Sequence, residues 1–153
     1  MKRRLGKEEN QKGFTLIELL AVIVILGIIA VIAVPLIGNV ISNSKDSADA
    51  ATARQVYDAA RLYVIGEKNG NFETVGNVTL AQMQDTGYLD KPLSLPSNKA
   101  VITTGTVHFN AQGQLANTTD TSTDAVSLTT ATGADGAAVA SNFSAKSVLS
   151  ATK

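Results

Sequence analysis

The sequence predicts an α+β chain: a long N-terminal helix packed on a small antiparallel β-sheet, followed by a flexible C-terminal region rich in Thr, Ser and Ala. Three observations predict this class. Residues 14–34 form an apolar run with one ionisable group, Glu18. A helical pattern continues from that run to about residue 66. Short stretches of β-branched residues then lie between residues 100 and 116, as in the strands of a small sheet.

The first half of the helix is long enough to cross a membrane. Its 21 residues, Phe14 to Val34, give about 32 Å of helix, close to the ~30 Å hydrocarbon core of a bilayer. An unpaired ionisable group within such a segment costs on the order of several kcal/mol. The position of Glu18 therefore predicts a functional role. The alternative is a glutamate that lies near the headgroups and is simply solvated.

The charges of the chain are divided at residue 13. Residues 1–13 carry five basic and two acidic side chains, a net charge of +3, which leaves −3 on the remainder. A basic flank before an apolar segment favours retention of that flank in the cytoplasm, so residues after the segment are expected outside the membrane. The mildly acidic remainder argues against direct nucleic-acid binding. An ordinary secretory signal, cut after the apolar region near Ala30 or Ala33, is the alternative for processing.

The sequence Lys-Gly-Phe-Thr-Leu-Ile-Glu, residues 12–18, resembles the processing site of type IV prepilins and pseudopilins. The match covers residues 1–35. The resemblance implies cleavage between Gly13 and Phe14 by a prepilin peptidase that also N-methylates Phe14. It further implies that Glu18 pairs with the N-terminal amine of an adjacent subunit during assembly. The chain has no cysteine, unlike the many pilins that close a C-terminal loop with a disulfide.

These features predict three regions: a cleaved leader (1–13), a transmembrane and filament-core helix (14–35) and an exported globular domain (36–153). Gly27 and Pro35 are expected to weaken the helix, because glycine is a poor helix former and proline lacks an N–H. The predicted elements of the exported domain are an amphipathic helix (36–66), a short helix (79–86), a sheet (100–116) and a low-complexity tail (117–153).

Several local signals support these elements. Gly66 or Gly70 is expected to end the long helix. Thr79 and Gln82 have the spacing of a capping box for the short helix. Spacings of three and four predict one packed stripe on the amphipathic helix, formed by Ile37, Ile41, Ser44, Ala48, Ala51, Gln55, Ala59 and Leu62. Whether this stripe covers the helix's own domain or contacts a neighbouring helix stays open. In the family that the chain resembles, both hold.

No pattern in the sequence points to catalysis, a cofactor or a metal. His108 is the only histidine, and it lies in a predicted strand as a half-exposed residue. Asp120 and Asp124 offer oxygen ligands, but without the regular carboxylate spacing of a calcium loop, so they are interpreted as solvated loop acids. Phosphate-binding glycine motifs and a nucleophile motif are absent from the sequence.

The resemblance therefore predicts a structural subunit of a type IV pilus-like surface filament, held in the cell membrane before assembly. The implied partners are the prepilin peptidase and N-methyltransferase, further copies and minor pilins, membrane lipid, and an inner-membrane platform protein with its assembly ATPase. One alternative is a pseudopilin of a type II secretion or competence DNA-uptake system. A remoter one is a single-pass anchored binding protein whose leader is never cut.

Overall fold

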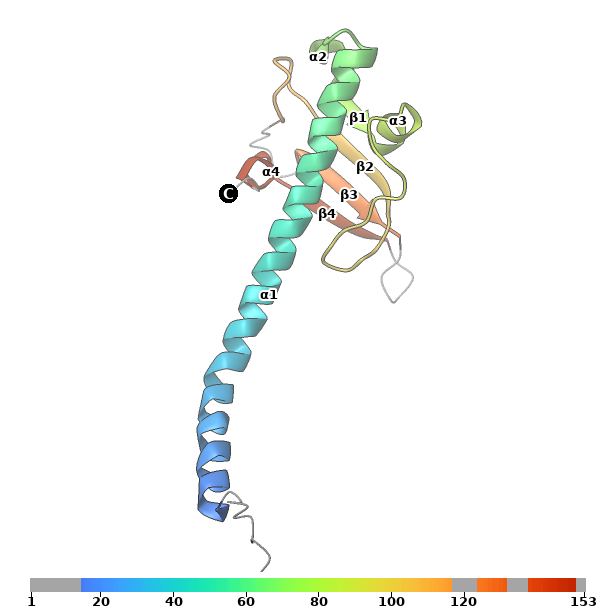
Figure 1. Cartoon of the computed structure of the whole chain (residues 1–153). Coiled ribbons are helices and arrows are strands. Elements are labelled where there is room, and N and C mark those ends of the chain that lie inside the picture. Colours follow the sequence, from blue (N-terminus) through green and yellow to red (C-terminus); the bar gives the residue numbers. More distant parts are fainter. Residues whose placement is uncertain (1–14, 117–123, 132–137, 151–153) are drawn as a thin grey trace, which may run out of the picture. The chain divides into compact units, whose positions relative to one another are not determined.

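The computed structural model describes residues 15–116, 124–131 and 138–150, and the chain divides into two units, Met1–Ile41 and Ser42–Lys153. One helix, α1 (Leu16–Glu67), contributes to both units (Figure 1). The long N-terminal helix predicted from the sequence is thus confirmed.

In the first unit, α1 is apolar on every side and none of its large apolar side chains is buried. Their exposed fractions run from 51% at Ile41 to 87% at Leu16. A helix that is hydrophobic all round is stable only where something other than water covers it. Among the described residues, α1 is the one helix that is long and apolar enough to cross a membrane, by length and composition.

In the second unit, α1 from Ser42 onward packs on a four-stranded sheet (Figure 1). The strands are β1 (Asn77–Thr79), β2 (Ile102–His108), β3 (Val126–Thr130) and β4 (Val139–Phe143). Their order in the sheet is β1-β2-β3-β4, and each neighbouring pair is antiparallel. This confirms the predicted α+β class, with a long helix on an antiparallel sheet.

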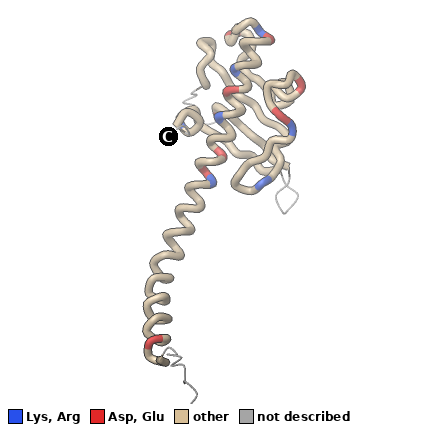
Figure 2. Tube along the Cα trace, viewed as in Figure 1, with Lys and Arg blue, Asp and Glu red and all other residues tan. Residues whose placement is uncertain are grey.

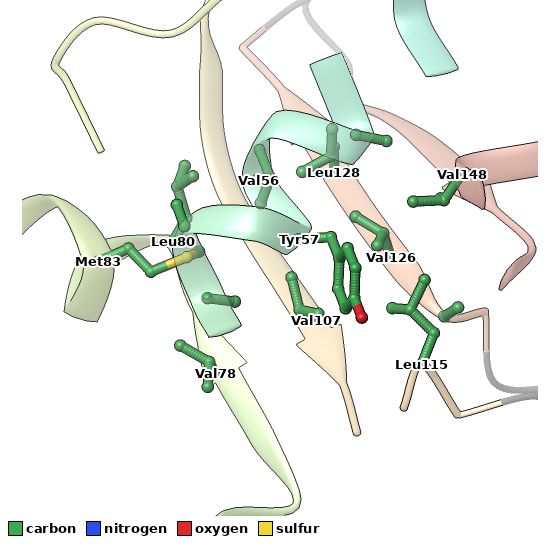
Figure 3. Close-up of a cluster of buried hydrophobic side chains, with 14 of the residues drawn as sticks. Val56, Tyr57, Val78, Leu80, Met83, Val107, Leu115, Val126, Leu128 and Val148 are labelled. Atoms are coloured by element: carbon green, nitrogen blue, oxygen red, sulfur yellow. The ribbon is translucent and has the colours of Figure 1, made fainter. Parts of the chain in front are cut away.

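The core of the second unit lies between α1 and one face of this sheet. Figure 3 shows Tyr57 of α1 beside Val107 of β2 and Val126 of β3. Seven side chains on α1 belong to the hydrophobic core cluster: Ala53, Val56, Tyr57, Ala59, Ala60, Tyr63 and Val64. Each Å² of apolar surface that is buried contributes about 25 cal/mol. This layer is therefore the main favourable contribution to the folding free energy of the unit.

The predicted packed stripe is wrong for the second unit's own core. Ala51 and Gln55 are exposed, and Leu62 is 55% exposed. Of the stripe's members from Ser44 on, Ala59 is the one that is buried. The core instead uses the adjacent face, which carries Val56 and Tyr63. Alanine occurs on both faces, so spacing alone did not separate them.

The shorter helices are α2 (Phe72–Val75), α3 (Leu80–Asp85) and α4 (Ala145–Ser150). The capping box of α3 is confirmed: the backbone N–H of Gln82 donates to the Thr79 hydroxyl at 3.4 Å, and the Gln82 carboxamide oxygen accepts from the Thr79 N–H at 2.9 Å. This box joins β1 directly to α3.

The end of α1 depends on two glycines in different ways. Gly70 follows the helix with φ of 74°, a conformation that favours glycine, and its N–H donates to the Val64 carbonyl at 3.0 Å. Gly66 lies within the last turn, where a Cβ would collide with the hydroxyl of Tyr88. Gly66 therefore makes room for the Tyr88 ring rather than ending the helix.

The described parts of residues 117–153, predicted as a low-complexity tail that could include an added edge strand, form two strands and a short helix. Residues 126–130 form β3, an inner strand of the sheet, and residues 139–143 form β4 at its edge. Val126 and Leu128 of β3 and Val148 of α4 are fully buried. A strand with one buried face needs an apolar residue only at every second position, so few apolar residues suffice. Residues 117–123, 132–137 and 151–153 lie outside the described residues.

Candidate functional site

The predicted site residues lie at two places along the first unit. Glu18 lies in the first turn of α1, and Gly27 and Pro35 lie further along the same helix. Gly13 and Phe14, the predicted cleavage and methylation residues, fall outside the described residues. The described part of the site therefore begins at Thr15.

Thr15 and Glu18 form a capping box at the start of α1. The Thr15 N–H donates to Oε2 of Glu18 at 2.8 Å, and the Thr15 hydroxyl donates to the same oxygen at 3.0 Å. In return, the Glu18 N–H donates to the Thr15 hydroxyl at 3.3 Å. Each side chain thus satisfies a backbone donor that the first helical turn leaves without a partner.

Thr15 is not among the predicted site residues, although the sequence carried the signal. Thr15-Leu16-Ile17-Glu18 has the spacing S/T-x-x-E that is typical of a helix start. The same spacing, with glutamine, predicted α3 correctly at Thr79. At Thr15 the pattern lies at the start of the membrane-length apolar run and overlaps the predicted processing motif, residues 12–18.

The capping box holds the Glu18 carboxylate without neutralising it. Hydroxyl and amide donors stabilise a carboxylate but carry no countercharge. Along α1, the next charged residue after Glu18 is Lys45 (Figure 2). These two residues are 27 positions apart in the sequence. Among the described residues of the first unit, 15–41, no Lys, Arg or His offers Glu18 a countercharge.

The two expected weak points do not interrupt the helix in this structure. Residues 16–67 are helical throughout, with Pro35 inside α1. Pro35 has no N–H, so the Val31 carbonyl lacks its usual partner four residues on. A Cβ at Gly27 would meet nothing within 4 Å, so the chain itself does not require glycine there. Loosening of this stretch on assembly stays a prediction.

The remaining candidate groups do not assemble into a site. His108 lies in β2 and is half-buried, as predicted. Asp124 lies just before β3, and Asp120 falls outside the described residues. Within residues 15–116, 124–131 and 138–150, no three His, Cys, Asp or Glu side chains are grouped so that they could hold a metal ion.

One known family model matches part of the first unit. The model of the prokaryotic N-terminal methylation motif matches residues 10–34, a range that contains Gly13, Phe14, Thr15 and Glu18. This motif is the signature of type IV pilins and pseudopilins, and with the apolar start of α1 it indicates membrane anchoring. It implies processing by a prepilin peptidase, and the proteins that carry it are structural rather than enzymatic. No curated protein and no solved structure matches the chain.

Proposed function

We propose that this chain, which carries the pilin and pseudopilin signature, is the structural subunit of a type IV pilus-like surface filament and assembles from a membrane pool after its leader is cut. One observation carries the proposal: Glu18 is a carboxylate held in place by Thr15 at the start of an all-apolar helix that offers it no cation within reach. A preoriented carboxylate with no cation within reach on its own helix favours a cationic partner that arrives only at assembly, when the surrounding helices exclude water.

Cleavage between Gly13 and Phe14 supplies that partner. Before cleavage the nitrogen of Phe14 is a neutral amide; afterwards it is an α-amine that remains cationic when methylated. Four residues separate Phe14 from Glu18, about 6 Å of helical rise. The amine of one copy then pairs with Glu18 of the next. Thr15 contributes by occupying Oε2, which orients the carboxylate toward the N-terminal end of the helix.

The apolar half of α1 can pass from lipid to the filament with little change in free energy. Leaving lipid for a bundle of like helices exchanges one apolar environment for another, so the transfer itself contributes little. The charge pair then selects the correct neighbour and its position along the helix. In this scheme the peptidase and N-methyltransferase act first. An inner-membrane platform protein and an assembly ATPase then drive extraction, and minor pilins join the filament.

The deciding experiment combines N-terminal mass with microscopy. Protein purified from membranes should begin at a methylated Phe14, and cells that express the gene should carry filaments that deletion removes. A protein that keeps Met1 and remains an isolated membrane protein would show an uncleaved single-pass anchor instead.

A pseudopilin of a type II secretion or competence DNA-uptake system is the second candidate. The matched motif, residues 10–34, is common to both groups. The two functions differ in the product: a pilin forms long, abundant surface fibres, whereas a pseudopilin forms a short filament whose loss stops secretion or DNA uptake. Fibre length at native expression, together with a secretion and transformation assay, separates them.

A further inference from the structure

β4 leaves one edge of the sheet open to a further strand. It pairs with β3 over the five residues Val139–Phe143, and no other described strand pairs with it. Edge strands usually avoid unwanted pairing by a bulge, a proline or charged side chains, and β4 has none of these. The opposite edge, β1, is only 3 residues long and runs directly into α3 (Figure 1). β4 is therefore the edge that can accept a partner.

The pairing pattern shows which backbone groups face this open edge. In an antiparallel pair, opposed residues alternate between those that exchange backbone hydrogen bonds and those that do not. The His108 N–H of β2 donates to the carbonyl of Ala125, just before β3, at 2.9 Å, so the odd-numbered residues of β3 bond to β2 and the even-numbered ones bond to β4. The latter lie opposite the odd-numbered residues of β4. The backbone N–H and C=O groups of Ala140 and Asn142 therefore point away from the sheet.

A cleft runs along this edge, between β4 and α1. Its volume is about 370 Å³, near the lower end of ligand pockets at ~300–1,000 Å³. It is lined by Asp46, Asp49 and Ala50 of α1, by residues 141–143 of β4 and by Ser147 of α4. Because successive side chains of a strand point to opposite faces, three consecutive lining residues place the cleft at the edge of β4 rather than on one face of the sheet. A strand added to β4 would cover it.

The charge of the cleft is negative. Among its lining residues, Asp46 and Asp49 are the ionisable ones. Asp49 is only 9% exposed, and its Oδ1 accepts a hydrogen bond from the Ser97 N–H at 2.9 Å. An amide stabilises a carboxylate but brings no countercharge, and neither aspartate forms an ion pair within the part of the chain that the structure describes. A buried carboxylate is costly unless it is paired, so the cleft fits a cation.

We propose that the open edge of β4 binds an extended segment of another protein, which adds to the sheet as a strand and places a lysine or arginine in the cleft beside Asp46 and Asp49. Backbone groups of the segment bond to Ala140 and Asn142, and its basic side chain supplies the cation that the two aspartates lack. A second copy of β4 does not fit, because Val139–Phe143 has no basic side chain. This binding site lies within the second unit and does not depend on filament formation.

Labelled peptides test the site on the full-length chain, purified in detergent. The probe is a short blocked peptide of alternating threonine and valine with one central lysine. Matched peptides carry arginine, glutamine or glutamate at the centre. Fluorescence anisotropy should show the lysine and arginine peptides binding about tenfold or more tightly than the glutamate peptide, with glutamine between them. Equal binding of all four peptides, or no binding of any, would overturn the proposal.

A pair of Asn142 variants tests the strand edge. Asn142→Pro removes the outward N–H but keeps the bonds between β3 and β4, so the lysine peptide should bind about tenfold more weakly or worse. Asn142→Ala is the matched control, because it removes the side chain and keeps the N–H, and it should bind as the natural chain does. Thermal unfolding, followed by circular dichroism, checks that both variants fold. Unchanged binding by a folded Asn142→Pro variant would rule out strand addition.

N-methylated peptides test the same point without changing the chain. Two forms of the lysine peptide carry methyl groups on the backbone nitrogens of either odd or even positions. Only one edge of an added strand faces β4, so one form should bind and the other should not. Equal binding by the two forms contradicts strand addition.

Asp49→Asn tests the charge. Asparagine keeps the Oδ1 acceptor for the Ser97 N–H but removes the charge, so the preference for the lysine peptide over the glutamine peptide should fall by about tenfold. Asp46→Asn should reduce this preference as well. Asp85→Asn is the control and should leave it unchanged, because Asp85 pairs with Lys91 and does not line the cleft. A preference for lysine that survives in the double variant of Asp46 and Asp49 would overturn the assignment of a basic partner.

Discussion

The two halves of α1 differ in both apolar content and environment. Residues 16–41 leave every large apolar side chain at least half exposed, whereas from Asp49 to Val64 the helix buries one face against its own sheet. The second half is therefore stabilised by contacts within the chain. The described residues bury none of the large apolar side chains of the first half, which needs lipid or other copies to cover it. Stability of the second unit and assembly of the proposed filament should respond to different mutations.

Charge separates the two halves in the same way. The second half has the Arg54–Asp58 pair at 3.3 Å, whose side chains are 30% and 56% exposed, so this pair contributes little to stability. The first half carries Glu18 and no other ionisable group. An ion pair made there, away from water, has a much larger effect when one partner is removed.

The largest effect is expected at the cleavage site. Gly13→Val should block the peptidase and leave a precursor about 13 residues heavier than the mature chain. Without the new amine, Glu18 lacks its cationic partner, and filaments should be absent even when the precursor is abundant. Mass spectrometry and electron microscopy measure the two results. Filaments built from an uncut precursor would show that the amine is not needed.

The second-largest effect is expected for Glu18→Gln. Glutamine keeps the size and hydrogen bonding of the side chain but removes its charge, so cleavage should continue while filament yield falls. Removal of one partner of a buried pair typically costs about 3–5 kcal/mol. Quantitative immunoblotting of sheared filaments, with total protein as the reference, measures the loss. Normal filaments at normal rates would refute the charge-pair mechanism.

Leu128→Ala sharpens the contrast between the halves. Leu128 is fully buried in β3, so truncation should destabilise the second unit by about 2–5 kcal/mol. Leu26→Ala is the matched control: Leu26 is 57% exposed in the first unit and should leave unfolding of the second unit unchanged. Circular dichroism during heating, in detergent, measures both. Equal destabilisation by the two changes would mean that the halves are energetically coupled.

Thr15→Val should have a smaller effect, because it removes the cap but keeps the Glu18 charge. Loss of an N-cap side chain costs about 1 kcal/mol. Filament yield should fall less than in Glu18→Gln, and Thr15→Ser, which restores the hydroxyl, should recover it. Failure of serine to rescue would indicate that the Thr15 methyl group, rather than the hydroxyl, is what assembly uses.

Local patterns predicted the parts of this fold that depend on neighbouring residues. The capping box at Thr79 and Gln82 formed as expected. It depends on residues three positions apart, where spacing decides which groups meet.

The features that the sequence did not predict depend on contacts between residues that are distant in the chain. β3 pairs with β2, for example Ser127 with Thr106. No pattern within residues 124–131 predicts that β2 is the neighbouring strand. On α1, two adjacent faces both have the period of a packed helix. The face with Val56 and Tyr63 packs against the sheet, and the face with Leu62 is exposed. One sequence cannot tell a face that packs within the chain from a face that packs between chains.

The smallest expected effect lies within the first half of α1. Gly27→Ala should stabilise the helix by about 1 kcal/mol, since alanine is the better helix former and a Cβ there meets nothing within 4 Å. In lipid this gain is silent, because backbone hydrogen bonds are kept in any case. In a filament, neighbouring copies can satisfy backbone groups, and the stretch from Gly27 to Pro35 is where the helix is expected to loosen. Alanine should therefore oppose loosening without preventing membrane insertion.

A filament map of the wild type and of Gly27→Ala would test this difference between the two halves. The wild type should show weakened helical density between Gly27 and Pro35, and regular helix from Ser42 to Glu67, where the sheet supports it. The variant should shorten the loosened stretch and give filaments that extend less under force. A continuous straight helix from Phe14 to Gly66 in the wild-type filament would refute the prediction, because Pro35 and Gly27 would then weaken the helix too little for assembly to open it.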